Sequence, residues 1–595
     1  MAKNKPNIPY VDNVDPYINL ETGAYIYKNP KSVTITKNGN YNVTLLNSID
    51  VNVEGGGSAD DDVVFYDYDG TVVTSYSAEK FAKRSSMPTN PTHEGLTAQG
   101  WNWTLEDAKK YVAEYGKLNI GQMYITSDGK TRIYIELPEG RTSPVLQLYL
   151  NENSKLDIDW GDGGNHSTFT STEASYQSER HEYATSGEYV ITITVKTGSF
   201  VLQSSTVSNN VLNILSDGVA DSVLNHIYRK AIKRVEIGEL VSGIGDNAFS
   251  NCNYLNSITM PNTFTVNSIG EKAFIGCNIL PYITIPNEIS SIKASAFQAC
   301  TLLYSISIPN TVNSFGANSF NACKSLLSIT LPDSITTIDS GMFTDCDVLT
   351  FINIPNSVTN ISSNAFNSCN ALMAVNMSNK LTTLASYAFF NCSLLSSIIL
   401  PDTVTNMGVQ VFYHCSSLTS ADILCNISEL PNATFEGCTA LSSAIISNNI
   451  TTIGSNAFID CNTLLYITIP SGINRILASA FSGCDHMFFI KFEPITPPNV
   501  SSSTAWSSVS TSTLIIVPVD SYTTYRTKAS TSGSYYPNPS TYTYIAYNIY
   551  TEGESLPTTT GSYNLTWYAS LDDLRAQTNP ITVGNGNEVY ARASS

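Results

Sequence analysis

Residues 296–316 read AFQACTLLYSISIPNTVNSFG, and residues 319–339 repeat the same pattern as SFNACKSLLSITLPDSITTID. The shared frame places a Phe three residues before a Cys and a Leu three residues after it. An alternation of Ile or Leu with polar residues follows, and it ends on a Pro. Self-similarity of this kind is typical of a solenoid, in which each repeat contacts only its neighbours.

The cysteines show how far this frame extends. Eleven of the twelve are in phase, 25 residues apart at the first step and 23 residues apart at each later step, and only Cys425 is out of phase. The in-phase residues, which we call the Cys ladder, are Cys252, Cys277, Cys300, Cys323, Cys346, Cys369, Cys392, Cys415, Cys438, Cys461 and Cys484. We predict a stacked domain of about eleven repeats over residues 235–492.

The residue types within one repeat predict its local structure. Alternating Ile residues indicate a short strand with one buried face, and Pro ends it because Pro has no N–H for the strand ladder. The Ala-Phe-x-x-Cys segment predicts a helical or 3₁₀ turn opposite the strand, with Phe and Cys pointing into the same core. A single repeat cannot bury that core, so we expect parallel strands stacked in register.

The Cys ladder raises the question of disulfides or a metal site. Stacked strands are about 4.8 Å apart, which is wider than the roughly 3.8 Å between Cβ atoms that a disulfide prefers. The spacing also matches no zinc motif. We therefore predict buried free thiols that act as small hydrophobic side chains.

The repeat motif AFxxCxxLxxIxIPxxVxxI resembles the BspA-like (Treponema-type) leucine-rich repeats. The resemblance implies a leucine-rich-repeat solenoid with a parallel sheet, and residues 493–556 look like the C-terminal cap of that family. Its members are mostly surface adhesins, which implies recognition of a partner and no enzymatic activity.

Residues between the buried strand positions would point to the concave face of such a solenoid. Several of them are large or aromatic, which suits stacking on sugars or anchoring a protein partner. The predicted ligand-binding set is Tyr282, Tyr304, Phe351, Met373, Tyr466, Phe488, Phe489 and Lys491. The alternative is that some of these side chains only cover neighbouring repeats.

Smaller modules flank the repeats. Residues 1–58 contain a hairpin signal at Asn38-Gly39 and end in a Gly-rich linker. The hairpin resembles a module of tail proteins from phages of Gram-positive bacteria. Residues 59–140 predict a mixed α/β module with a helix over 105–115 that Thr104 caps. The remaining segments are a connector or N-terminal cap at 199–234 and a small β module at 557–595.

Residues 141–198 contain the turn Asp159-Trp160-Gly161-Asp162-Gly163, followed by His181-x-Tyr183. This segment resembles a PKD-type β-sandwich. Carboxylates at Asp157, Asp159 and Asp162 offer hard oxygen ligands for Ca²⁺. Since Asp side chains also close turns without a metal, we expect no cofactor and no metal here.

One motif resembles an enzyme signature. Asp67-x-Asp69-Gly70-Thr71 is similar to the first motif of haloacid-dehalogenase-type phosphatases, in which paired Asp residues supply the nucleophile and the acid–base group. Only a short segment follows it before the next module, and Asp-Gly between apolar residues is also a hairpin turn. We interpret it as a turn and predict that the protein is not an enzyme.

Charge and hydropathy exclude further classes of function. The net charge of −19 argues against nucleic-acid binding, which needs a basic face. No apolar stretch is long enough to span a membrane, and the first residues contain no apolar core of a secretory signal. The fold class is therefore mainly β with short helices: small β modules and a PKD-like sandwich followed by the solenoid.

Two functions remain compatible with the sequence. The first is a bacteriophage virion protein (a tail fibre, tail tip or head fibre) that binds a glycan or protein receptor on its host and attaches to other virion proteins through residues 1–58. The second is a cellular surface adhesin that binds a host protein or glycan. A homo-oligomer is compatible with both.

Overall fold

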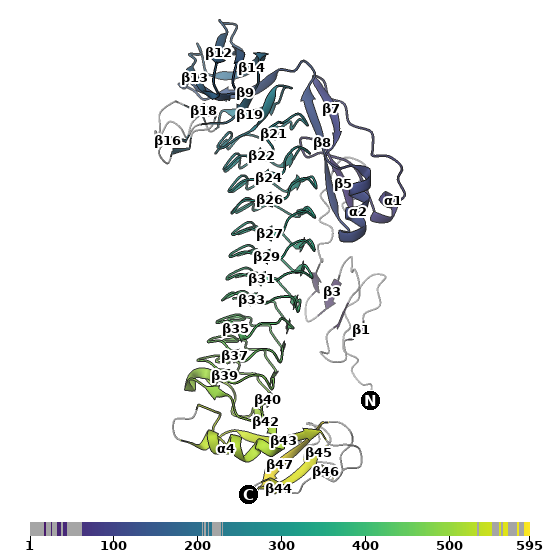
Figure 1. Cartoon of the computed structure of the whole chain (residues 1–595), viewed down its shortest axis with the longest axis vertical. Coiled ribbons are helices and arrows are strands. Elements are labelled where there is room, and N and C mark those ends of the chain that lie inside the picture. Colours follow the sequence, from purple (N-terminus) through teal and green to yellow (C-terminus); the bar gives the residue numbers. More distant parts are fainter. Residues whose placement is uncertain are drawn as a thin grey trace.

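The computed structural model describes residues 62–204, 214–216, 228, 230–531 and 535–549, together with the backbone of several short strands outside these ranges. Figure 1 shows a long, nearly straight column of stacked turns with a β-sandwich at one end and a mixed module along its side. The predicted class, mainly β with a parallel-stranded solenoid, is confirmed. Because the column is nearly straight, the face that we expected to be concave shows little curvature.

The Ile-x-Ile segments form one column of short parallel strands, as predicted. Equivalent residues of successive repeats pair directly, for example Tyr282 with Ser305 and Phe351 with Ala374. The strands of this first column are β21 (Ser257–Ile258), β23 (Tyr282–Thr284), β25 (Ser305–Ser307), β28 (Phe351–Asn353), β30 (Ala374–Asn376), β32 (Ser397–Leu400), β34 (Ser420–Ile423), β36 (Ser443–Ile446), β38 (Tyr466–Ile469) and β40 (Phe489–Phe492).

A second column of parallel strands lies across the core from the first, and the sequence pattern did not lead us to expect it. Each strand contains the apolar residue in the second half of the repeat, such as Ile292 or Ile361. The strands are β20 (Val241–Ile244), β22 (Ser268–Ile269), β24 (Ser291–Ile292), β26 (Ser314–Phe315), β27 (Thr337–Ile338), β29 (Asn360–Ile361), β31 (Thr383–Leu384), β33 (Asn406–Met407), β35 (Glu429–Leu430), β37 (Thr452–Ile453), β39 (Arg475–Ile476) and β41 (Asn499–Val500).

The Phe and Cys residues of the repeat form the dry interior. The Phe rings stack from Phe249 to Phe481 with centroids 5.0–5.8 Å apart, and Trp506 continues the stack beyond the last repeat. Every member of the Cys ladder is buried, as predicted. From Cys277 onward each thiol lies 3.0–3.3 Å from the carbonyl oxygen of the preceding repeat's Phe, to which it donates.

The Ala-Phe-x-x-Cys segment is a pair of tight turns, so the predicted helical or 3₁₀ turn is wrong in detail. Two residues of each of the eleven repeats have a positive φ, as Asn318 and Ala322 do on either side of Phe320. Left-handed residues interrupt a helix. The backbone N–H groups instead bond across repeats, with Phe320 N–H donating to the Met342 carbonyl at 3.0 Å.

The β-sandwich closes the N-terminal end of the column. One sheet has the order β12-β11-β14-β9-β19-β21 and the other has the order β13-β10-β15-β20, with β18 beside β10. Both sheets therefore end on solenoid strands, and the sandwich is a continuous cap. Its further strands are β9 (Thr131–Leu137), β10 (Val145–Leu150), β11 (Ser154–Asp159), β12 (Ser167–Ser171), β13 (Ser175–Arg180), β14 (Gly187–Thr197), β15 (Phe200–Leu202), β18 (Leu215–Ser216) and β19 (Ile232–Glu236).

This arrangement changes the expected boundaries of the sandwich. We had assigned β9 to the module at 59–140, but β9 pairs with β14 and β19 in the middle of a sandwich sheet. The sandwich therefore begins before residue 141. It also extends past residue 198, because β15 pairs with both β10 and the solenoid strand β20.

The mixed module over residues 62–126 is a small four-stranded sheet covered by two helices. Its order is β6-β5-β8-β7, and its elements are β5 (Val63–Tyr66), β6 (Val72–Tyr76), α1 (Ala78–Ala82), β7 (Leu96–Trp101), α2 (Leu105–Tyr115) and β8 (Leu118–Thr126). The predicted helix and its cap are confirmed, since the Thr104 side chain accepts a hydrogen bond from Asp107 N–H. The predicted Asp-Gly hairpin is also present, between β5 and β6.

Hairpins near the N-terminus are described only by their strands, which are β1 (Tyr17–Ile18), β2 (Tyr25–Ile26), β3 (Val33–Thr36) and β4 (Asn40–Val43). The antiparallel pairing of β3 with β4 confirms the predicted hairpin, although Asn38 and Gly39 lie outside the described residues, as does the Gly-rich linker at 55–57. Another short hairpin pairs β16 (Thr206–Val207) with β17 (Asn210–Val211).

The C-terminal segments extend the sheet of the solenoid. Strands β38, β40, β42, β43, β47, β45 and β44 follow one another in one sheet, so the last strands share a sheet with the cap. The elements after the repeats are η1 (Ser503–Trp506), β42 (Leu514–Pro518), η2 (Val519–Ser521), α4 (Tyr522–Ser530), β43 (Thr543–Ile549), β44 (Thr559–Thr560), β45 (Tyr563–Tyr568), β46 (Pro580–Ile581) and β47 (Glu588–Ser594). Among the described residues, no helix combines the length and apolar composition that crossing a membrane requires.

Candidate functional site: the strand face

The predicted ligand-binding residues lie along the outward side of the first column. Alternate residues of each strand point away from the core, and parallel pairing in register lines them up in rows along the column. One row contains Tyr466 and Phe489, and the next contains Thr468 and Lys491. We call this surface the strand face, and we divide it into an upper part (β23, β25 and β28) and a lower part (β30 to β40).

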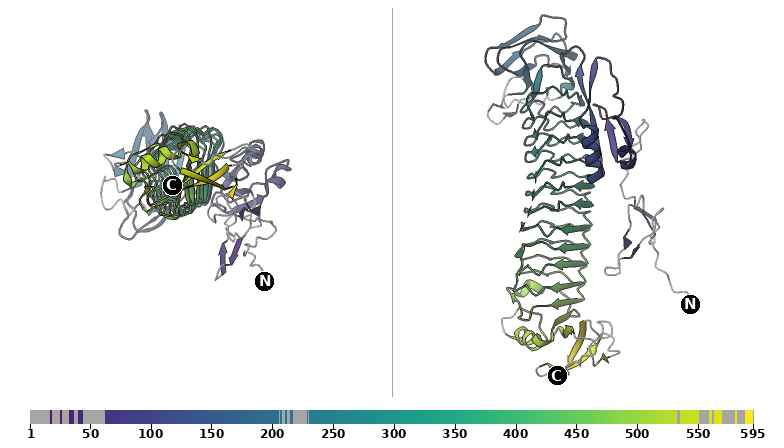
Figure 2. Two further views of the ribbon diagram at one scale, coloured as in Figure 1. Left: turned by 90° about the horizontal axis from the view of Figure 1, so that it is seen from below. Right: turned by 45° about the vertical axis from the view of Figure 1, so that its right-hand side comes forward.

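The upper strand face is covered by the 62–126 module, as Figure 2 shows. The Tyr282 side chain is only 1% exposed, and its ring stacks on that of Tyr66 with the centroids 4.9 Å apart. The Tyr304 hydroxyl donates a hydrogen bond of 2.6 Å to the carbonyl of Gly70. The prediction that Tyr282 is an exposed ligand-binding residue is therefore wrong, because an earlier segment of the same chain occupies its surface.

Side chains of the module reach the backbone of three consecutive repeats. Asn102 Nδ2 donates to the Ile285 carbonyl at 3.0 Å and Trp103 Nε1 donates to the Ile308 carbonyl at 3.0 Å. The Tyr111 hydroxyl donates to the Leu331 carbonyl at 2.9 Å. Trp103 and Tyr111 are themselves buried. Polar groups buried in this way require partners, so these bonds fix the position of the module along the column.

The module accepts hydrogen bonds from the repeats as well. Ser307 Oγ donates to the Asn119 carbonyl at 2.8 Å, and Asn353 Nδ2 donates to the Tyr115 carbonyl at 2.8 Å. The Asn353 side chain, from β28, meets the C-terminal end of α2, where helix carbonyls lack partners within the helix. The contact therefore gives a partner to a polar group on each surface. It marks the lower edge of the part of the strand face that the module covers.

The lower strand face carries apolar side chains among Ser, Thr and Asn. Ile399 is 65% exposed and Ile445 is 56% exposed. Both belong to the same outward row, in which each pairs with Asp422 of the intervening repeat. Leu424 is also exposed. We did not predict these three residues from the sequence because we selected mainly aromatic side chains. Their aliphatic side chains at outward positions of the repeat could have identified them.

The other predicted residues are spread along the strand face. Phe351, at the edge of the module, and Phe488 are exposed, whereas Met373 is half-buried. Tyr466 and Phe489 stack on each other with centroids 5.3 Å apart, which fits the alternative that some rings cover neighbouring repeats. The Lys491 ammonium lies 4.6 Å from the centroid of the Tyr547 ring and 3.8 Å from Glu493. The predicted residues therefore do not form one site, because Tyr282 and Tyr304 lie under the module whereas the others lie further along the column.

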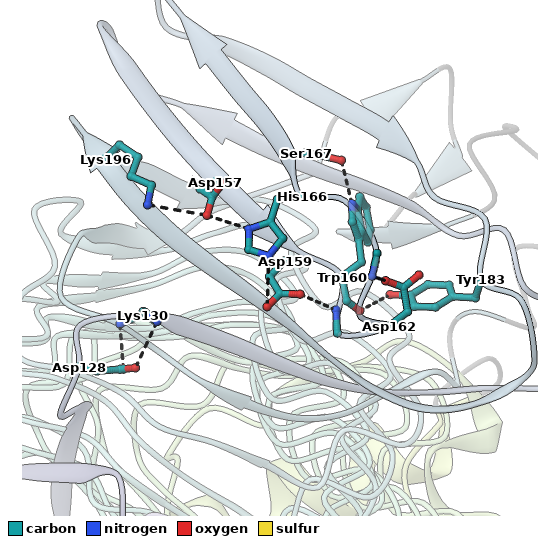
Figure 3. A network of polar contacts seen from close by, with 12 residues as sticks. Asp128, Lys130, Asp157, Asp159, Trp160, Asp162, His166, Ser167, Tyr183 and Lys196 are labelled. Atoms are coloured by element: carbon teal, nitrogen blue, oxygen red, sulfur yellow. Dashed lines mark hydrogen bonds and ion pairs between the residues drawn. The ribbon is translucent and has the colours of Figure 1, made fainter.

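The carboxylates of the sandwich turn form local contacts, which Figure 3 shows. Asp159 and Asp162 accept hydrogen bonds of 2.9 Å from the N–H groups of Gly161 and Gly164, respectively, as a turn closed by Asp side chains requires. Asp157 lies 3.1 Å from His166. The Gly164 N–H and His181 lower the pKa of Asp162 below its usual value. Within the described ranges, no group of three or more metal-ligating side chains is placed to hold a metal ion.

The phosphatase-like motif is a closed turn. The Asp67 carboxylate is buried and lies 2.7 Å from His93 Nε2, while Asp69 accepts a hydrogen bond from Thr71 N–H at 2.9 Å. The Asp67 carboxylate therefore contacts a side chain, whereas the Asp69 carboxylate accepts a hydrogen bond within the turn. This geometry fits the interpretation of the motif as a hairpin turn.

A cleft of about 710 Å³ lies where the module, the sandwich and the first repeat meet. Its cationic side chains are paired, since Arg234 is 3.3 Å from Glu236 and Lys233 is 2.5 Å from Glu136. The Arg234 guanidinium also lies 4.0 Å from the centroid of the Tyr134 ring. All of these contacts lie within β19 or between β9 and β19 of the sandwich.

The fold and the strand face together define a repeat protein of the β-solenoid class, with an internally stacked core and an outward ladder of side chains. Residues 242–373 and 359–488 match the family model described as a BspA type leucine rich repeat region. The protein is therefore a leucine-rich-repeat protein, and the resemblance inferred from the repeat motif is confirmed for this region.

Solved structures of leucine-rich-repeat proteins are similar to the chain. A protein from Bacteroides ovatus is 25% identical, with 56% of this chain and 92% of that chain covered and a TM-score of 0.38. The leucine-rich-repeat protein of T. pallidum is 31% identical, with 30% and 79% covered and a TM-score of 0.26. A leucine-rich cell surface protein from Faecalibacterium prausnitzii is 29% identical, with 46% and 86% covered and a TM-score of 0.29. No curated protein matches the chain.

Proposed function

We propose that this leucine-rich-repeat protein is a non-enzymatic recognition protein that binds a partner at a bacterial surface through its lower strand face. The observation that supports this best is the exposure of Ile399 and Ile445 in one outward row. Single apolar residues on a surface are ordinary, but residues aligned on a regular, polar-rimmed face resemble the anchors of an interface. The upper strand face also supports the proposal, because it already binds a protein surface, the 62–126 module.

Our first candidate location is a bacteriophage particle. In this proposal the protein is a tail fibre, tail tip or head fibre, and residues 1–58 attach it to other virion proteins. The pairing of β3 with β4 supports the phage-like hairpin that suggested this location. The alternative is a cellular surface adhesin, which the BspA-type repeats support because that family consists mostly of adhesins.

Binding to cells tests the proposed surface. The full chain, labelled with a fluorophore, would be incubated with candidate host bacteria and measured by flow cytometry. We expect the double substitution I399D/I445D to reduce retention at least tenfold, because two charges would enter the centre of the contact. The matched control is I495D, since Ile495 is 73% exposed but lies beyond the repeats. Equal retention of the double variant and the wild type would contradict the proposal.

The location is tested separately. Mass spectrometry of purified phage particles should detect the protein if it belongs to a virion, whereas limited proteolysis of intact bacteria should release it if it is an adhesin. Detection in neither fraction would rule out both locations.

A further inference from the structure

The prolines of the repeat control which backbone carbonyls are available on the column. At two of the positions after the strand that are not Pro, the N–H bonds to the repeat before it: Ser447 N–H donates to the Ile423 carbonyl at 3.1 Å, and Glu493 N–H donates to the Ile469 carbonyl at 3.0 Å. A Pro at this position has no N–H. The equivalent carbonyl of the preceding repeat is then left without its ladder donor.

The 62–126 module binds to carbonyls of this kind. Pro309, Pro332 and Pro355 occupy the position equivalent to Ser447. The carbonyls that they leave free belong to Ile285, Ile308 and Leu331, and these are the three that accept hydrogen bonds from Asn102, Trp103 and Tyr111. The match in three consecutive repeats indicates that the prolines create the acceptors on which the module docks.

The same feature recurs on the lower strand face. Pro401 and Pro470 occupy the equivalent position and remove the ladder donor of the Met377 and Ile446 carbonyls. Ile399, two residues before Pro401, and Ile445, directly before Ile446, are both exposed.

We propose that the Met377 and Ile446 carbonyls form a second docking strip, for a protein segment that presents side-chain N–H or O–H donors of the Trp, Tyr or Asn type. Both carbonyls lie on the column that the module occupies, two and five repeats beyond Leu331, the last of the three carbonyls, so the partner would use the same chemistry further along the column. Apolar contact with Ile399 and Ile445 would accompany these hydrogen bonds. This inference rests on the proposed function and specifies the chemical class of the partner.

The test supplies each of the two carbonyls with a backbone N–H donor and leaves the outward side chains of the strand face unchanged. The substitutions P401S and P470S introduce an N–H at positions where the chain already tolerates Ser, at Ser378 and Ser447. The probe is a displayed library of random dodecapeptides, selected on the immobilised full chain. The control is S447A, which retains the N–H that bonds to Ile423.

We expect selected peptides to be enriched in Trp, Tyr and Asn and to bind the P401S/P470S chain more weakly, by about fivefold for each carbonyl closed. Binding to the S447A chain should be unchanged. A lack of selected peptides, or equal affinity for the double variant, would overturn the inference. Saccharide binding that I399D/I445D abolishes but P401S/P470S does not would also overturn it, and would leave the proposed recognition function intact.

The role of the prolines is also testable within the chain. P332S would place an N–H against the Ile308 carbonyl, where it competes with Trp103. We expect faster hydrogen exchange in the module, by at least threefold at its slowest amides, without a change in the exchange of the repeats beyond Cys369. Unchanged exchange in the module would show that the prolines do not determine its docking.

Discussion

The left-handed residues are the least obvious feature of each repeat. Ala322 has a φ of 58° and sits between Phe320 and the next strand. A non-Gly residue in this region costs roughly 1–3 kcal/mol, whereas a Gly at the same position costs about 0.5–1 kcal/mol of unfolded-state entropy. The strain term is the larger of the two, so the repeat carries strain that glycine would relieve.

We therefore expect A322G to raise the free energy of unfolding by about 1 kcal/mol. Urea denaturation followed by circular dichroism would measure it. The control is A294G, which changes a residue whose φ is not positive and should lower stability by about 0.5–1 kcal/mol. Destabilisation by both substitutions would show that the left-handed position is not strained.

The buried thiols predict how stability depends on pH. Burial raises the pKa of Cys300 and of Cys415 to about 12 and that of Cys425 to about 11. Because the pKa in the folded state lies above that of an unfolded thiol, the stabilisation is complete below the unfolded pKa and is lost as the pH rises through the folded pKa.

We expect the urea midpoint to fall steadily from about pH 9 upward, with each buried thiol contributing about 1.4 kcal/mol per pH unit. The variant C300A should show a shallower decline at high pH, even though its cavity lowers stability at neutral pH. Parallel curves for the variant and the wild type would contradict this assignment.

Among the elements, the strands of the repeat are stabilised mainly by their neighbours. Two-residue strands such as β24 and β29 are far shorter than the strands of most sheets. They persist because the ring stack and the Cys–Phe hydrogen bonds link each repeat to the next. The residue that closes the end of the ring stack is therefore expected to stabilise the last repeats.

Trp506 of η1 closes the ring stack, with its ring centroid 5.0 Å from that of Phe481. We expect W506A to lower the stability of the C-terminal repeats by about 3–5 kcal/mol, because it exposes the last ring and leaves a cavity. W506F should be much milder, since it keeps a stacked ring and removes an indole N–H that lacks a partner among the described residues. Hydrogen exchange of β38 and β40 would measure both effects, and equal effects of the two substitutions would refute the stacking argument.

Across the molecule, both ends of the column are closed by strands of other segments. An open solenoid end exposes a strand edge and apolar core, which favours aggregation. The sandwich covers one end through the pairings of β19 with β21 and β15 with β20, and β42 with the strands after it covers the other. The module on the side performs a different task, because it covers a face and not an end.

The solenoid was predictable because its information is local. A period of 23 residues places Phe, Cys, Leu and Ile in one interior, and each repeat needs only its neighbours to bury them. The helix at 105–115 and the Asp-Gly hairpin were predictable for the same reason, since capping and turn residues lie within a few positions of the elements they define.

The covering of the upper strand face could not be predicted in this way. It depends on contacts such as Asn102 with Ile285 and Tyr115 with Asn353, which join residues 183 and 238 positions apart. No periodicity or local propensity encodes such pairs, because they arise only after both surfaces have folded. The chain's own pattern thus fixed which residues point outward along the column, and long-range packing decided which of them water can reach.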